Sequence, residues 1–196
     1  LSTIFDYDRR TTSYNWINNY IMAYRFGMVL MLFWALTTTA QIHYRPVSLP
    51  DTATLHLTEI HYPVDGVLVS GHGWRNGRIH HGLDISHNNR DTVYSSWLGR
   101  VRYAKTGYNG GYGYLVIVTH LNGLETYYAH LRELLVEEGD WIPQGCPVGI
   151  VGSTGNSLGP HLHFEIRYQG LSIDPEDVVD KNTIHLHRSG DIFKVR

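Results

Sequence analysis

The sequence predicts an all-β protein whose main domain is a compact antiparallel β-sheet. The composition is the first reason, because 20 glycines and 14 tyrosines, with only 17% charged residues, suit short strands joined by tight turns. The second reason is a series of strand-like apolar runs, which read DGVLVSG, RVRYAK, YLVIVTH, ETYYAHL, PVGIVG and HLHFEIRY. Glycine-containing turns such as YNGGYG, LNG and VEEGD separate these runs, which is typical of consecutive hairpins.

Length, charge and cysteine content narrow the possible classes of function. A chain of 196 residues has room for one domain with extensions and can bury a sizeable core. Its net charge of −2 gives no electrostatic reason to expect nucleic acid or an anionic membrane surface as a partner. The single cysteine, Cys146, excludes an internal disulfide and is expected to be a buried thiol. The 13 histidines, in contrast, are compatible with a metal site.

Residues 22–40 have the pattern of a secretory signal peptide. Arg25 precedes an apolar run from Met28 to Leu36, and small and hydroxyl-bearing residues then lead to Ala40. The apolar run is shorter than the roughly 20 residues that span a bilayer. We therefore expect export with cleavage near Ala40, and a signal anchor or a buried helix are the alternatives.

Composition divides the chain into four segments. Residues 1–40 are expected to form an N-terminal extension with the signal peptide or anchor, residues 41–60 a polar lead-in linker, residues 61–179 the functional domain, and residues 180–196 a polar C-terminal tail. A start at Met22 or Met28 would leave residues 1–21 outside the functional product.

The stretch GPHLHFEIR, residues 159–167, places two histidines one residue apart in a predicted strand. Side chains alternate between the two faces of a strand, so His161 and His163 are expected to share one face. The apolar residues between and after them would then face the core. Two neighbouring imidazoles on a strand are explained by a metal or by a reaction that uses them, although a solvated strand face is the simpler alternative.

Upstream, GRIHHGLDIS contains His80 and Asp84 in an H-x-x-x-D spacing. Histidine nitrogen and aspartate oxygen are both zinc ligands, and catalytic zinc sites typically use three protein ligands and a water. With His163 as the third ligand, these residues would leave the fourth position for water. His81 competes by proximity, but adjacent residues of an extended segment point to opposite faces, so only one of the two histidines is expected to bind with Asp84.

Four motifs follow one another along residues 61–179: GWRNGRIHHGLDIS, GGYGYLVIVTHLNGLETYYAHL, GSTGNSLGPHLHFEIR and IDPEDVV. Together they resemble the lysostaphin/LytM-type zinc metallopeptidases, which cut peptide cross-links in bacterial peptidoglycan. The resemblance implies a compact antiparallel β domain with a long open substrate groove and one bound Zn²⁺ ion. It also implies peptidoglycan peptide stems as the substrate and a location in the bacterial cell envelope, periplasmic or extracellular.

By matching motif positions, the resemblance implies that His80, Asp84 and His163 are the zinc ligands and that His130 and His161 are unligated catalytic histidines. The chain has no H-E-x-x-H sequence, so histidines must carry the proton transfer. We expect His161 to take the proton from a zinc-activated water and pass it to the leaving amine, while His130 stabilises the oxyanion. The sequence equally permits the reverse assignment of these two histidines.

Four further side chains are predicted to contact the substrate. Tyr112 and Tyr128 offer aromatic faces that can pack on a peptide. Asn156 and Ser157, in the turn before the histidine strand, can form hydrogen bonds to a substrate backbone. Core packing for the tyrosines and turn formation for the polar pair are the structural alternatives.

A non-catalytic activator or cell-wall-binding module that retains its metal for stability is the main alternative function. A metal-dependent hydrolase of another peptide is a third possibility. The presence of both His130 and His161 favours an enzyme, because a structural metal site would need neither. Membrane contact is expected only through an N-terminal anchor.

Overall fold

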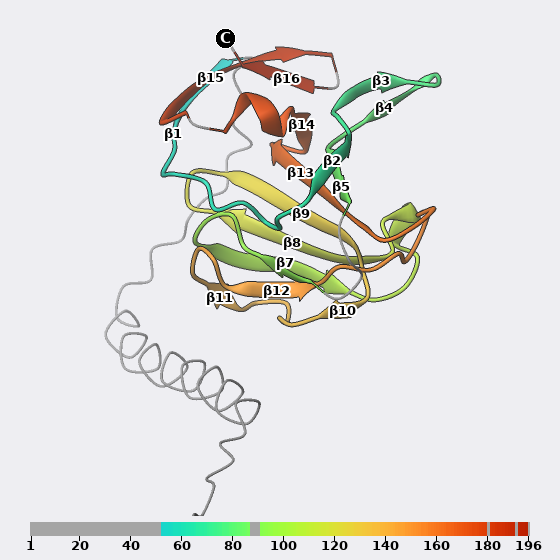
Figure 1. Ribbon diagram of the computed structural model, residues 1–196. Helices are drawn as coiled ribbons and strands as arrows, with labels where there is room; N and C mark the ends of the chain where they lie inside the picture. Colours follow the sequence, from blue (N-terminus) through green and yellow to red (C-terminus); the bar gives the residue numbers. More distant parts are fainter. Residues whose placement is uncertain (1–51, 87–90, 180, 191, 196) are drawn as a thin grey trace, which may run out of the picture. The chain divides into compact units, whose positions relative to one another are not determined.

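The structure is a computed structural model that describes residues 52–86, 91–179, 181–190 and 192–195 (Figure 1). The predicted signal peptide or anchor at residues 1–40 lies outside this part. Within the described residues there is no helix that is long and apolar enough to cross a bilayer.

These residues form sixteen strands and two 3₁₀ turns (Figure 1). In chain order they are β1 (Thr52–His56), β2 (Val67–Ser70), β3 (Gly73–Arg75), β4 (Arg78–His80), β5 (Leu83–Ser86), β6 (Thr92–Tyr94), β7 (Gly99–Lys105), η1 (Asn109–Gly111), β8 (Tyr114–His120), β9 (Leu124–Leu131), β10 (Glu133–Leu134), β11 (Trp141–Ile142), β12 (Pro147–Ile150), β13 (His161–Tyr168), β14 (Leu171–Ile173), η2 (Pro175–Asp177), β15 (Thr183–Ser189) and β16 (Ile192–Val195). The all-β prediction is confirmed.

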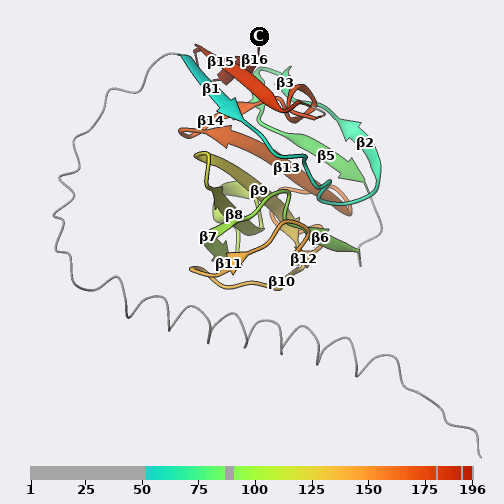
Figure 2. The same cartoon turned by 90° about the vertical axis from the view of Figure 1, so that its left-hand side faces the viewer.

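Eleven of the described strands belong to one sheet, which is visible from two sides in Figures 1 and 2. Nine of them follow the order β1-β15-β16-β14-β13-β9-β8-β7-β11, and β5 and β2 join at β13. All pairings are antiparallel except that of β14 with β16. A small sheet, β10-β12-β6, and the β3–β4 hairpin complete the described structure.

Strand β13 is the centre of this arrangement because three strands pair with it. On one edge it pairs with β9, and on the other it pairs first with β5 and then with β14. Its apolar residues Leu162, Phe164 and Ile166 are at most 2% exposed and belong to the main hydrophobic core. The alternation predicted for this strand is therefore confirmed, and its polar side chains lie on the opposite face.

A second, smaller apolar group supports that opposite face. It consists of Leu115 and Ile117 from β8 and Tyr127 and Ala129 from β9. Ala129 is paired directly with His163 in the β9–β13 ladder. The polar residues of β13 thus stand beside a packed apolar surface.

Strands β1, β15 and β16 lie in the segments that the sequence indicated as a lead-in linker and a polar tail. β1 pairs with β15, and β15 pairs with β16. Ile184, Leu186 and Phe193 are at most 2% exposed, so this part of the chain contributes to the core. The alternation of apolar residues here is short, and polar side chains such as His185 alternate with them, which made the segment read as a tail.

Replacing Ile184 by Ala tests whether residues 183–195 belong to the cooperative domain. Because Ile184 is fully buried, we expect a loss of about 2–5 kcal/mol in the free energy of unfolding. His185→Ala, at an exposed neighbouring position, is the matched control and should change it by less than about 0.5 kcal/mol. Denaturant unfolding measures both, and equal effects of the two variants would mean that β15 folds apart from the core.

Candidate metal centre

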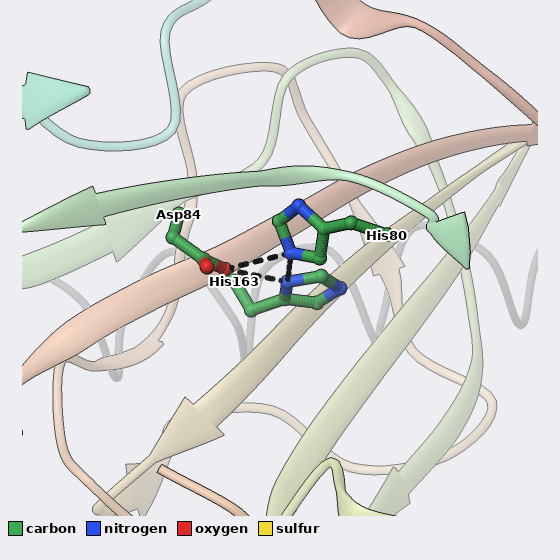
Figure 3. Close-up of side chains that lie close together, drawn as sticks. All are labelled: His80, Asp84 and His163. Carbon is green, nitrogen blue, oxygen red and sulfur yellow. Dashed lines mark hydrogen bonds and ion pairs between the residues drawn. The ribbon is translucent and has the colours of Figure 1, made fainter. Parts of the chain in front are cut away.

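His80, Asp84 and His163 meet at the junction of three strands (Figure 3). Asp84 and His163 are direct cross-strand partners in the β5–β13 ladder, and this pairing places their side chains side by side. His80 ends β4 and reaches the same point from the adjoining hairpin. The structure thus brings together the three residues that the sequence suggested as metal ligands, from positions up to 83 residues apart.

The close approach of β5 to β13 depends on a glycine. A Cβ atom on Gly82 would lie 2.2 Å from the carbonyl oxygen of Phe164 and 2.8 Å from the Cγ of Glu165. Any larger residue would therefore push the start of β5 away from β13. Gly82 sits between the two ligand candidates His80 and Asp84 and allows both to reach His163.

The three candidate ligand atoms form a tight triangle. The Nε2 of His80 lies 3.1 Å from the Oδ1 of Asp84 and 3.0 Å from the Nδ1 of His163. The Nδ1 of His163 lies 2.8 Å from the same Asp84 oxygen. Both imidazoles are buried, with His80 8% and His163 6% exposed.

Hydrogen bonds on the far side of each imidazole determine which nitrogen faces the triangle. The Nδ1 of His80 donates to the carbonyl oxygen of Gly71 at 2.7 Å, and the Nε2 of His163 donates to Glu165 at 2.8 Å. Each ring then turns its other nitrogen toward Asp84. Three lone-pair atoms this close together require a shared positive charge, either a proton or a cation, and nitrogen–oxygen donor sets of this kind suit Zn²⁺. The residues therefore fit a metal ion.

The local charges have large effects on the titration of this cluster. Burial alone would lower the pKa of His163, but its hydrogen bonds with Asp84 and Glu165 outweigh burial and raise that pKa to about 9. Burial would raise the pKa of Asp84, yet hydrogen bonds from His163 and His80 hold it far below its usual range. In the metal-free protein the triangle therefore holds a proton at neutral pH.

Two further residues contact the triangle, and no sequence motif pointed to either of them. Glu165, fully buried, accepts the hydrogen bond from His163. Arg75, in the β3–β4 hairpin, donates to the Oδ2 of Asp84 at 3.2 Å. Glu165 was detectable in principle, since it follows His163 by two residues and must share its strand face. Nothing in the local sequence links Arg75 to Asp84 on β5.

His130 and His161 lie beside the triangle. Their ring centroids are 4.7 Å apart, and the His130 ring is 5.8 Å from that of His163. The Nδ1 of His130 donates to the carbonyl oxygen of Thr154 at 2.8 Å, and the Nδ1 of His161 donates to that of Gly159 at 2.8 Å. Both rings therefore keep Nε2 as a free acceptor, and the Nε2 of His161 is 3.7 Å from the Oδ1 of Asp84.

A β-bulge directs His130 to this position. Between its pairs with Tyr114 and Val116, strand β9 contains one residue more than β8, and His130 adopts a left-handed φ of 59°. Simple alternation from the buried Tyr128 would have turned His130 toward the main core. Burial, together with the nearby imidazoles of His161 and His163, lowers the pKa of His130 to about 4, so this ring is neutral at pH 7.

The four residues predicted to contact the substrate lie in different environments. Tyr128 is fully buried, and its hydroxyl accepts from the backbone N–H of Ser96, so it is not available to a substrate in this structure. Tyr112 is partly buried, with its ring 5.8 Å from that of His163. Asn156 and Ser157 lie in the loop before β13. Asn156 is exposed, and its backbone N–H donates to Gly111.

His81 points away from the triangle. Its Nδ1 lies 3.1 Å from the Oγ of the buried Ser172, which also lies 3.0 Å from the Nε2 of His72. Desolvation is the main cause that lowers the pKa of His81. Only one of the two adjacent histidines, His80, thus stands next to Asp84.

A family model for peptidase family M23 matches residues 78–175, a stretch that contains the whole triangle together with His130 and His161. The chain belongs to peptidase family M23. The M23 domain is 41% identical over 107 residues to the DD-carboxypeptidase/endopeptidase Mpg of Neisseria meningitidis serogroup B, which covers 55% of this chain and 24% of that protein. It is 36% identical over 114 residues to the murein hydrolase activator NlpD of Salmonella dublin, and this match covers 58% of this chain and 29% of that protein. The chain thus spans less than a third of the length of these curated relatives.

Two solved structures resemble the M23 domain. The catalytic domain of lysostaphin from Staphylococcus simulans is 28% identical, with a TM-score of 0.53 over 57% of this chain and 90% of that one. A zinc-containing peptidase from Vibrio cholerae is 29% identical, with a TM-score of 0.55 over 61% of this chain and 39% of that one. The resemblance to lysostaphin-type peptidases indicated by the sequence motifs is confirmed.

The raised pKa of His163 predicts how the stability of the metal-free protein depends on pH. Its folded-state pKa of about 9 lies above the unfolded value near 6.5, so its contribution is complete below pH 6.5 and disappears as pH rises through 9. We expect the protein stripped of metal to lose up to about 3 kcal/mol of stability over this range. Denaturant unfolding with a chelator measures this, and His163→Gln should abolish the slope. A stability that rises from pH 6.5 to 9 would contradict the assignment.

Proposed function

We propose that this chain is a zinc-dependent endopeptidase that hydrolyses peptide cross-links of bacterial peptidoglycan. The observation that carries the proposal is the position of His130 and His161 beside the metal triangle, with both Nε2 atoms free to accept protons. A metal that only stabilised the fold would need neither ring. The proposal extends what family membership alone provides, since the family contains relatives with different named activities.

His80, Asp84 and His163 are the proposed ligands of one zinc ion. Their nitrogen and oxygen atoms converge, and the hydrogen bonds to Gly71 and Glu165 orient the two imidazoles. When bound, zinc would supply a Lewis acid that polarises the scissile carbonyl and lowers the pKa of a water molecule. The zinc-containing peptidase of Vibrio cholerae, which shares the fold, supports this choice of metal.

His161 is the proposed general base. Its Nδ1–H is held by the carbonyl oxygen of Gly159, so its Nε2 faces the triangle and can accept the proton of the attacking water. The same nitrogen can then donate this proton to the leaving amine. Its place 3.7 Å from the Oδ1 of Asp84 keeps it within reach of any water bound next to the ligands.

His130, whose ring centroid lies 4.7 Å from that of His161, is the proposed catalytic partner of His161. As a neutral ring with Nδ1–H bound to Thr154, it presents a lone pair and not a donor. It stabilises a developing oxyanion only once its Nε2 is protonated, and the same atoms allow His130 and His161 to exchange roles. The proposal therefore requires both rings and leaves their order to kinetics.

Peptidoglycan is the proposed substrate because both curated relatives carry murein- or DD-peptidase names. Export to the cell envelope, periplasmic or extracellular, follows from the same substrate and from the signal-peptide pattern of residues 22–40. Tyr112, Asn156 and Ser157 remain the proposed contacts to the peptide. Tyr112 and Asn156 come from loops that pack together, since the N–H of Asn156 donates to Gly111 at 2.7 Å.

An activator role is the second candidate, and the similarity to the murein hydrolase activator NlpD favours it. The two functions separate in one experiment with purified peptidoglycan. An endopeptidase releases soluble fragments by itself and stops when a chelator removes its metal. An activator releases none alone but accelerates release by an added murein hydrolase, and mass spectrometry of the fragments shows which bond is cut.

The ligand assignment predicts which histidines zinc requires. Asp84→Ala and His163→Ala should each lose the metal, because a three-ligand site has no ligand to spare. His81→Ala is the matched control, since His81 bonds Ser172 and should leave about one zinc per chain. Metal analysis after gel filtration measures the content. Zinc loss in His81→Ala together with retention in His163→Ala would reverse the assignment.

The catalytic assignment predicts activity loss without metal loss. His161→Ala and His130→Ala should retain zinc yet release peptidoglycan fragments at least about a hundredfold more slowly, the usual effect of a positioned acid or base. The double variant should lose less than the product of the two single losses, because groups that act together are not additive. His185→Ala, at an exposed position of β15, is the control and should keep full activity. Undiminished hydrolysis by His161→Ala would refute the mechanism.

A further inference from the structure

Glu165 is a charged side chain in a fully buried position. It lies on β13, two residues after His163 and on the same face, and its exposed fraction is 0%. A buried carboxylate is costly unless charged or hydrogen-bonded partners surround it. Its partners therefore show what the residue does.

Three side chains hold the carboxylate of Glu165 in place. Its Oε1 accepts from the Nε2 of His163 at 2.8 Å and from the hydroxyl of Tyr112 at 2.9 Å. Its Oε2 accepts from the Nε of Arg167, whose Nη2 also donates to the Tyr112 hydroxyl at 2.9 Å. The Arg167 guanidinium is in turn stacked on the Tyr127 ring, 4.6 Å from its centroid. Tyr112 and Arg167 thus hold the carboxylate of Glu165 in the position where it accepts the hydrogen bond from His163.

We propose that Glu165 is a positioning residue for the metal: it holds His163 in the tautomer and ring orientation that directs Nδ1 at the metal. The hydrogen bond from Nε2 to Glu165 keeps a proton on that nitrogen, so Nδ1, which faces the Nε2 of His80 and the Oδ1 of Asp84, is the nitrogen left to bind a metal. A negatively charged acceptor also makes the imidazole a stronger donor to a metal. The inference rests on the proposed function only in that the triangle binds zinc.

A purely structural ion pair between Glu165 and Arg167 is the alternative. It would explain the burial of both groups but would not involve the ligand property of His163. The two explanations differ when both charges are removed together. A structural pair is dispensable as a pair, because apolar side chains can replace both partners with little cost to stability. A positioning residue is not, since His163 then lacks its acceptor.

Two variants at this position and one control separate the explanations. Glu165→Gln leaves one acceptor oxygen, which cannot serve His163 and Arg167 at once. The double variant Glu165→Met with Arg167→Met removes both charges and so preserves folding if the single variant does not fold. Glu125→Gln is the matched control, because Glu125 lies on β9, pairs with Arg102 and contacts Tyr127.

Zinc affinity is measured on the full chain by competition with a chromogenic chelator. We expect Glu165→Gln and the double variant to bind zinc about 10- to 100-fold more weakly, the usual effect of losing an outer partner of a ligand histidine. Glu125→Gln should stay within about twofold of wild type. Nitrogen-15 NMR of the zinc-loaded proteins supplies a second readout, because without its carboxylate acceptor the His163 ring should bind the metal through Nε2 in part of the population and no longer through Nδ1 alone.

The outcomes distinguish this inference from the proposed function. Wild-type zinc affinity in a folded Glu165→Gln variant, or its recovery in the double variant, would overturn the positioning role and leave the peptidase proposal intact. Absence of zinc binding by the wild-type protein would instead overturn the proposed function. Weakened binding in both variants, with metal-free melting temperatures close to wild type for the double variant, supports the inference.

Discussion

The cross-strand pair of Asp84 and His163 is the contact on which the arrangement of the site depends. The β5–β13 ladder places the two residues opposite each other, and Gly82 permits the close approach that this register needs. A shift by one residue would turn either side chain into the core and separate the pair. Because β13 also pairs with β9 and β14, its register is fixed from both edges, and this also fixes the positions of Asp84 and His163 in the triangle.

Polar groups in the site are oriented by partners that lie farther from the triangle. Gly71 and Glu165 hold the imidazoles of the two candidate ligands, while the carbonyl oxygens of Thr154 and Gly159 hold those of His130 and His161. In all four rings one nitrogen donates away from the cluster, so the other faces into it. In the proposed peptidase the proton acceptors would be oriented before a substrate arrives, which would reduce the reorganisation required during reaction.

The loops around the site are held by backbone contacts. The loop before β13 approaches η1 so closely that a Cβ atom on Gly155 would lie 2.3 Å from the backbone nitrogen of Gly113. The same loop provides the carbonyl of Thr154 that orients His130, and the bulge in β9 turns that histidine toward it. Glycine is needed at positions 113 and 155 because φ is positive at both and neither has space for a side chain.

The sequence by itself determined the all-β class and the shared strand face of His161 and His163, which follows from strand alternation. It also grouped His80 and Asp84 with them, through the resemblance of four motifs. Alternation acts over two residues, so it can be read locally. It did not reveal the strands after Val179, where a short pattern with histidines hid buried residues such as Ile184.

Tertiary structure alone decided how the groups behind the candidate ligands are enclosed and how His130 reaches the site. The bulge in β9 overrides local alternation, and the burial of Tyr128 depends on the core packed against its strand. The contact of Arg75 with Asp84 joins the β3–β4 hairpin to β5, and the enclosure of Glu165 requires Tyr112 from a loop 53 residues away. Such contacts arise from the pairing of distant strands, and no local pattern encodes them.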